Sequence, residues 1–145
     1  MLLKIFIAAC MMVATTGIHA GGMILAMHAF RAGEARDKRR LHRTRVYRVS
    51  GTVLIMFLAS LVEMLVWAAA YLALGAIQGL ERAVYFSMVT FTTLGYGDIL
   101  IDGRWRLLAS FEAANGIIMF GWSIAIVIAV VQRVYFSKEP GHMDR

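Results

Sequence analysis

The chain has 145 residues, of which 60% are hydrophobic, with a mean hydropathy of +0.69 and a formal net charge of +6. This composition excludes an ordinary soluble domain and is typical of a membrane protein. A single cysteine, Cys10, excludes an internal disulfide and any multi-cysteine metal site. Eight of the fifteen Lys and Arg residues fall between Arg31 and Arg48, beside an apolar segment, so the charge indicates membrane orientation rather than nucleic-acid binding.

Residues 5–30 carry no Lys, Arg, Asp or Glu, and about 20 apolar residues suffice to cross a bilayer, so we predict a first span here. A cleaved signal peptide is the alternative, with Lys4 before the apolar run and a processing site near 19–21. The run continues well past that site, and cleavage would tend to leave the Arg-rich segment outside, so we favour an uncleaved span. His19 and His28 are expected to pack rather than to sense pH.

Residues 31–48 form the one strongly polar block, in which Arg36, Arg39, Arg40 and Arg43 could share a helical face. A topological anchor is the favoured interpretation, and a site for anionic lipid headgroups is the alternative. We do not expect a voltage sensor, because its arginines would recur at every third position inside an apolar helix, whereas these lie outside one.

Two further apolar segments, 49–77 and 107–131, predict a second and a third span. Glu63 lies near the middle of the second and is expected to face protein, because a carboxylate in hydrocarbon is costly. Three spans place the N-terminus outside and the C-terminus in the cytoplasm. Eleven Lys and Arg residues then fall inside and four outside, which follows the positive-inside rule.

The segment between these spans is too polar to cross a membrane and too short to cross and return. Glu81 suits the N-terminus of a short helix that ends before Thr93, so the dipole at its C-terminal end would favour a cation. Non-helical backbone at membrane depth is tolerated only where it is buried in protein or lines water. We therefore predict a re-entrant loop.

Residues 92–98 of that loop read TTLGYGD. A dehydrated cation needs oxygen ligands, which rings of backbone carbonyls from several chains can supply. Carbonyls that all point one way force alternate residues into a backbone conformation that Gly95 and Gly97 permit. Thr93 adds a hydroxyl oxygen at the inner end, and we expect Leu94 and Tyr96 to point away from the axis.

This run resembles the selectivity filter of potassium channels, with Leu94 where the common pattern has Val, and residues 49–131 resemble their two-helix pore module. The resemblance implies an all-α membrane protein with three transmembrane helices, a re-entrant pore helix and a filter loop, assembled as a homotetramer. It implies passive K⁺ conduction, with K⁺ as the permeant ligand held at Thr93, Leu94, Gly95 and Tyr96 and no other cofactor. The expected layout is a first helix at 1–30, a basic cytoplasmic linker at 31–48, a pore domain at 49–135 and a short cytoplasmic tail at 136–145. Within the pore domain we expect an outer helix at 49–77, a pore helix at 81–92, a filter at 93–97 and an inner helix at 105–133.

The resemblance also implies roles around the filter. Val89 stands where some members have a carboxylate that supports the filter Asp, so we expect Glu112 to support Asp98 instead. The residues expected to support the filter as a whole are Thr92, Asp98 and Glu112. Gly116 and Gly121 match a gating hinge, although small-residue packing explains them equally well. The expected cavity-lining residues are Ile117, Phe120, Ile124 and Ile128, with ordinary packing of an apolar helix stripe as an equal alternative.

Two other functions were weighed. A non-conducting, regulatory channel-like subunit would keep the fold, but the intact glycines oppose it. An intramembrane aspartyl protease would use Gly95–Asp98 as a GxGD motif, yet it needs a second aspartate, and the spans offer only Glu63 and Glu112. We therefore expect no enzyme, and by family likeness a bacterial inner membrane.

Overall fold

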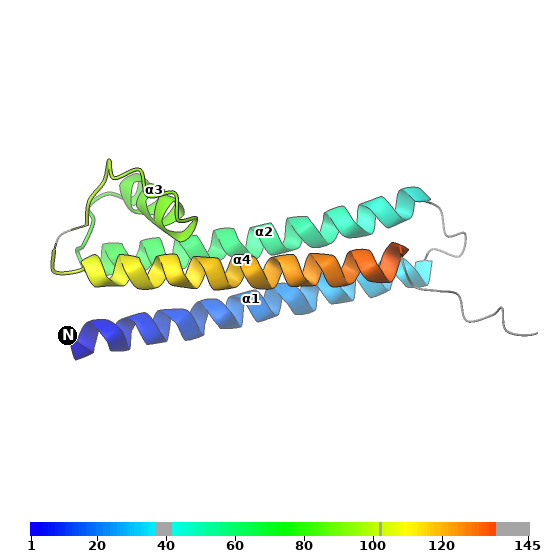
Figure 1. Cartoon of the computed structure of the whole chain (residues 1–145), viewed down its shortest axis with the longest axis horizontal. Helices are drawn as coiled ribbons and strands as arrows, with labels where there is room; N and C mark the ends of the chain where they lie inside the picture. Colours follow the sequence, from blue (N-terminus) through cyan, green and yellow to red (C-terminus); the bar gives the residue numbers. More distant parts are fainter. Residues whose placement is uncertain (37–41, 102, 136–145) are drawn as a thin grey trace, which may run out of the picture.

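The computed structural model describes residues 1–36, 42–101 and 103–135. This part of the chain contains four helices and no strand: α1 Leu2–Arg36, α2 His42–Ala73, α3 Leu80–Phe91 and α4 Arg106–Tyr135. Helices α1, α2 and α4 run side by side along the long axis, and the short α3 sits at one end, the end that holds the N-terminus (Figure 1). Three segments are long and apolar enough to cross a membrane: Leu2–Gly33, Arg45–Ala73 and Arg106–Tyr135. The predicted all-helical membrane fold is confirmed.

The polar block at 31–48 is more helical than its description as a linker suggests. Helix α1 continues to Arg36 and α2 already begins at His42. Arg, Lys and Glu are good helix formers, so the helices extend beyond their apolar parts. The predicted arginine face lies outside the described part of the chain, which lacks Arg39, Arg40 and the side chains of Arg36 and Arg43. The predicted tail at 136–145 also lies outside it.

Helix α2 ends at Ala73, four residues earlier than expected, because of a glycine. Gly75 has a φ of 62°, the left-handed conformation that favours glycine. The Gly75 N–H donates to the Leu72 carbonyl at 3.0 Å, and the Ala76 N–H donates to the Tyr71 carbonyl at 2.9 Å. These two bonds satisfy carbonyls that the helix leaves without partners and so terminate it. Helix α3 at 80–91 and helix α4 at 106–135 differ from the predicted ranges by one or two residues.

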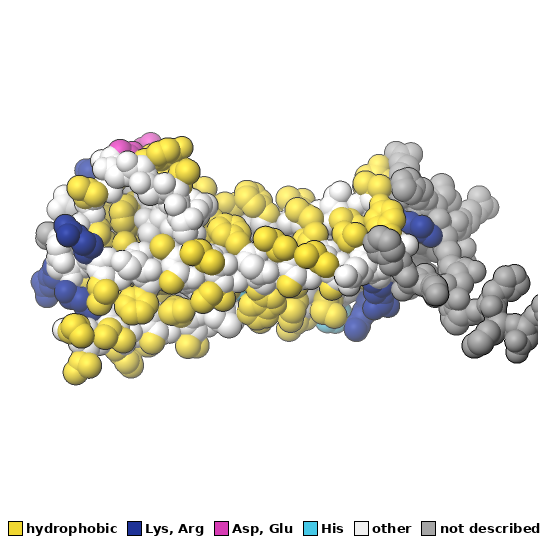
Figure 2. All heavy atoms as spheres, viewed as in Figure 1, with side chains coloured by type: hydrophobic (Ala, Val, Ile, Leu, Met, Phe, Trp, Pro, Cys, Tyr) yellow, Lys and Arg dark blue, Asp and Glu magenta, His cyan; other side chains and the backbone are white. Residues whose placement is uncertain are grey.

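The best-packed core lies where α3 rests on α2 and α4. Trp67 and Tyr71 of α2, Phe91 of α3 and Met119 of α4 are almost completely buried there. The Tyr71 and Phe86 rings meet edge to face with centroids 5.3 Å apart. Elsewhere many large apolar side chains stay exposed along the helices (Figure 2). Such exposure suits helices that face lipid or other chains.

Candidate functional site

The last turn of α3 leads directly into residues 92–98, which we call the 92–98 loop. The Thr92 hydroxyl donates to the Met88 carbonyl at 2.7 Å, and the Leu94 N–H donates to the Val89 carbonyl at 2.9 Å. The second bond reaches back over the helix end and fixes the direction in which the loop leaves. The loop therefore starts from a rigid element.

Positive φ angles alternate along the 92–98 loop. They are 60° at Thr93, 57° at Gly95 and 78° at Gly97, and Thr93 is the one non-glycine residue of the described part with a positive φ. Leu94 and Tyr96 therefore lie between left-handed residues. This alternation is the backbone pattern that carbonyls pointing to one side require. The sequence did not indicate a positive φ at Thr93, because a β-branched residue is strained in that conformation. Backbone strain of this kind is concentrated at functional sites.

The side chains of the 92–98 loop have little cover from their own chain. Leu94 is 55% exposed and Tyr96 is 69% exposed. A pocket of about 300 Å³ lies behind the loop, between α3 and the start of α4, with Val89, Gly95 and Ala109 in its lining. One chain thus leaves both side chains largely uncovered and a pocket open beside Gly95.

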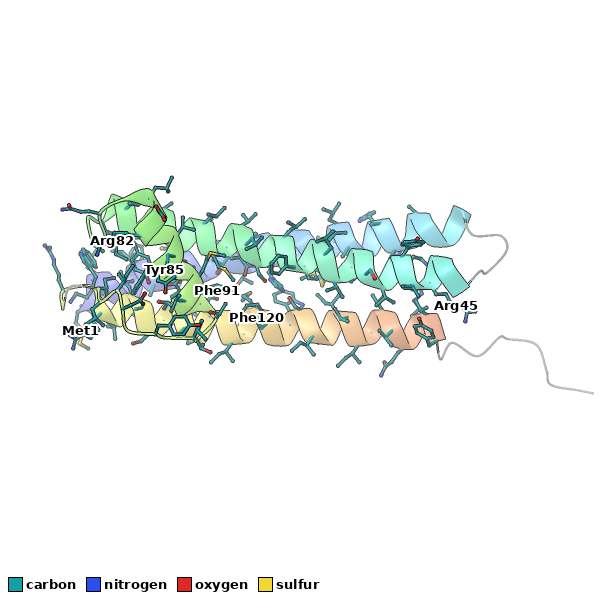
Figure 3. All side chains as sticks on the ribbon, turned by 90° about the horizontal axis from the view of Figure 1, so that it is seen from above. Met1, Arg45, Arg82, Tyr85, Phe91 and Phe120 are labelled. Atoms are coloured by element: carbon teal, nitrogen blue, oxygen red, sulfur yellow. The ribbon has the colours of Figure 1, made fainter. Side chains whose placement is uncertain are left out.

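Asp98 is held by α3 and not by α4. The Tyr85 hydroxyl donates to Asp98 Oδ2 at 2.7 Å. Tyr85 lies one turn before Val89, on the helix that precedes the loop (Figure 3). This hydrogen bond raises the pKa of the Tyr85 hydroxyl, so the neutral, donating form persists above the usual range. The sequence carried a signal for this bond, a tyrosine at helical spacing from Val89, that our prediction did not use.

Glu112 has partners other than Asp98. It is completely buried, its Oε2 accepts from the Tyr71 hydroxyl at 2.6 Å, and its Oε1 lies 2.5 Å from Ser87 Oγ. Ser87 Oγ also donates to the Met64 carbonyl at 2.7 Å. The carboxyl group therefore joins α2, α3 and α4. The structure thus gives Glu112 contacts with the body of α3, and support of Asp98 by Glu112 stays a prediction.

Comparison with known proteins decides the family. A family model described as ion channel matches residues 47–133, which include almost all of α2, the whole of α3 and most of α4. The chain belongs to the ion channel family. Curated proteins and solved structures give no match. In this channel the 92–98 loop, Tyr85 and Glu112 lie inside the family match, and α1 lies outside it.

The last helix of the channel, α4, passes very close to the end of α3. Gly116 is buried, and a Cβ atom there would lie 1.9 Å from the Phe91 carbonyl oxygen. The rings of Phe91 and Phe120 meet nearly at right angles with centroids 5.7 Å apart (Figure 3). Close packing therefore accounts for Gly116. Gly121 has no neighbouring atom within 4 Å of such a Cβ, so its role as a hinge stays a prediction.

One face of α4 is apolar and open. Ile117, Ile124 and Ile128 are 62%, 60% and 50% exposed. At about 100° per residue these three side chains share a face of the helix. Phe120 is only partly exposed because it packs on Phe91. The face is available to line a cavity of the channel, which stays a prediction.

The channel's first helix, α1, is attached to α2 and α4 by buried polar groups. His19 Nδ1 lies 2.7 Å from Glu63 Oε1, and both side chains are fully buried. The other ring nitrogen of His19 lies 3.2 Å from Ser123 Oγ. The Asn115 amide donates to Thr15 Oγ1 at 2.8 Å. Glu63 thus faces protein, as its cost in lipid required, and its partner is one of the two histidines of the first span.

The carboxylates of the channel are dispersed. Asp98 bonds to Tyr85, Glu63 to His19, and Glu112 to Tyr71 and Ser87. Among the described residues no group of three or more His, Cys, Asp or Glu could hold a metal ion. An aspartyl protease needs two acids that share a proton, so we do not propose one.

Proposed function

We propose that this channel conducts K⁺ selectively and passively through a pore formed by the 92–98 loops of four copies. The observation that carries the proposal is the alternation of left-handed backbone at Thr93, Gly95 and Gly97. A loop of this kind can turn successive carbonyl oxygens toward one side, where they replace the water of a dehydrated cation. The proposed K⁺ ligands are Thr93, Leu94, Gly95 and Tyr96.

The exposed surfaces support an assembly of several copies. A single chain supplies carbonyl ligands on one side only, whereas a dehydrated cation needs rings of carbonyl oxygens around it. Leu94 and Tyr96 are largely exposed in one chain, and their neighbours Gly95 and Gly97 line a pocket. Neighbouring copies would cover these side chains and would surround a cavity lined by Ile117, Ile124 and Ile128. A homotetramer follows from the potassium-channel resemblance.

The helix before the loop adds an electrostatic contribution. The C-terminal end of α3 carries a partial negative charge, and it lies directly beside the 92–98 loop. A cation next to this end is stabilised by the dipole. We propose that this end faces a cavity on the cytoplasmic side. We also propose that the N-terminus lies outside and that the host is a plasma membrane such as a bacterial inner membrane.

Reconstitution in liposomes tests the proposal. Purified channel is placed in a potassium/sodium gradient, and the reversal potential is measured with and without external barium. We expect a reversal potential near that of K⁺ and block by barium. Equal sodium and potassium permeability would refute selectivity, and absence of flux from a folded tetramer would indicate a non-conducting subunit.

A further inference from the structure

A groove of about 380 Å³ runs between α1 and α4, at the end of the helices that lies away from α3. Its walls are apolar, and Arg31 and Arg133 stand among its lining residues at the two helix ends. The walls include Met23, Met27 and Phe30 of α1 and Ala125, Ile126 and Ala129 of α4. The groove is therefore apolar along its length and cationic at one end.

Arginines from two helices stack on one ring at that end. The guanidinium carbon of Arg48 lies 5.0 Å from the Phe30 ring centroid, and that of Arg133 lies 5.6 Å from it. Arg31 follows Phe30 in the chain. The Nε atom of Arg48 is buried and makes no hydrogen bond in the described part of the chain. A buried guanidinium nitrogen without an acceptor is costly, so Arg48 favours a nearby anion, although it lines a neighbouring pocket of about 240 Å³ and not the groove itself.

The acidic side chains that the structure describes lie elsewhere. Glu81, Asp98 and Glu112 belong to the half of the molecule that contains α3, and Glu63 pairs with His19. Lys and Arg side chains are visible in dark blue at the end away from α3 (Figure 2). The described charged side chains at the mouth of the groove are therefore cationic, which complements a phosphate group.

The groove faces away from the proposed pore. At about 100° per residue, Trp122, Ile126 and Arg133 lie on nearly the opposite side of α4 from the face that holds Ile117, Ile124 and Ile128. If that exposed face lines the cavity, the groove opens to the bilayer. This step rests on the proposed function, and it favours lipid over a second copy of the chain.

We propose that the groove binds an anionic phospholipid. One acyl chain lies along the apolar walls, and the phosphate is held by Arg31 and Arg133, with Arg48 adding to the positive field. Ala125 and Ala129 are exposed and small, so they leave room for the chain between the helices. The site joins α1, which lies outside the family match, to the inner helix of the channel.

Lipid binding to the purified full-length channel tests this site without any measurement of ion flux. The channel in detergent is titrated with dioleoyl-phosphatidylglycerol or dioleoyl-phosphatidylcholine, and bound lipid is counted by native mass spectrometry. We expect tighter binding of phosphatidylglycerol. Arg31→Gln and Arg133→Gln should each weaken it about fivefold, the effect of about one arginine near an anionic lipid surface.

Arg104→Gln is the matched control, because Arg104 is also exposed and also stacks on an aromatic ring, but near the start of α4. It should leave phosphatidylglycerol binding unchanged. Equal binding of the two lipids, or an equal loss in the control, would overturn the proposal. Unfolding temperatures of all variants show whether a loss reflects misfolding.

A cross-linking experiment identifies what occupies the groove. Ala129→Cys in a Cys10→Ser background is labelled with a photoreactive group and irradiated in vesicles that contain phosphatidylglycerol. An adduct with lipid supports the proposal, and an adduct between two chains overturns it. Because neither experiment measures conduction, failed conduction and failed lipid binding are distinguishable outcomes.

Discussion

A methyl group on Gly116 would lie 1.9 Å from the carbonyl oxygen of Phe91. The backbone of α4 therefore touches the backbone of α3 at the last residue before the 92–98 loop. No side chain stands between them that could adjust. The position of Gly116 thus sets how closely the proposed inner helix approaches the end of the proposed pore helix.

Gly116→Ala should destabilise the channel, because the added methyl group must displace one helix from the other. Overpacking of this kind costs about 1–3 kcal/mol. We expect a lower unfolding temperature in detergent and reduced potassium flux in liposomes. Gly121→Ala is the control for the unfolding temperature, since its Cβ meets no atom within 4 Å and alanine is the better helix former. Wild-type stability in Gly116→Ala would contradict the close contact.

Gly95→Ala should abolish selective conduction. Gly95 has a φ of 57°, which alanine adopts only with strain. The loop would lose the alternation on which one-sided carbonyls depend. The reversal potential in a potassium/sodium gradient measures the effect. Gly103→Ala is a control in the nearby connection, where a Cβ would meet no atom within 4 Å; normal selectivity in Gly95→Ala would refute the proposed filter.

Tyr85→Phe removes the donor to Asp98 and keeps the ring. Because the side chain is exposed, we expect little change in the unfolding temperature but a faster loss of current during prolonged conduction. The wild type should behave like the variant only at strongly alkaline pH. The pKa of Tyr85 is raised above its usual value near 10. The bond therefore persists below that value and is lost as the pH rises through the raised pKa. A current decay that is the same in both proteins at neutral pH would contradict this role.

Glu112→Leu should cost more stability than Glu112→Gln. Leucine leaves the buried Tyr71 hydroxyl without an acceptor, at about 1–3 kcal/mol, and removes one of the two partners of Ser87. Glutamine can accept from Tyr71 through its oxygen and donate to Ser87 through its nitrogen, while Ser87 keeps its bond to the Met64 carbonyl. Thermal unfolding of the two purified variants measures the difference, and equal stability would contradict the three-helix contact.

The His19–Glu63 pair allows a double-mutant cycle on the attachment of α1. His19→Leu or Glu63→Leu alone leaves one buried polar group without its partner, which costs about 3–5 kcal/mol. The double Leu variant has neither polar group and should be more stable than either single variant. Additive losses in the unfolding free energy would show that the two side chains do not interact.

Chain length and hydropathy predicted the three spans well, because hydrocarbon thickness fixes the length of an apolar segment. Helix ends were predicted less well. The early end of α2 depends on Gly75 in a left-handed turn, and the helical parts of 31–48 depend on charged residues that favour helix without apolar periodicity. The roles predicted for residues of the third span came from the resemblance over TTLGYGD, because the residue pattern alone does not assign them.

The partners of the buried polar groups depended on tertiary structure. Glu112 was expected to support Asp98, and the structure instead pairs it with Tyr71 and Ser87, while Tyr85 holds Asp98. Spacing along one helix gives the face on which a side chain lies. It does not say which residue of another helix stands opposite.

The sequence by itself determined that this chain crosses a membrane and that Gly95 and Gly97 permit left-handed backbone in residues 92–98, because both follow from local composition. Only the tertiary structure decided that Thr93 shares the left-handed conformation, that Gly116 meets the Phe91 carbonyl, and that His19 reaches Glu63. Each of these relations joins residues through the packing of whole helices or through the path of a loop between them. Such relations depend on helix rotation and depth, which hydropathy leaves undetermined.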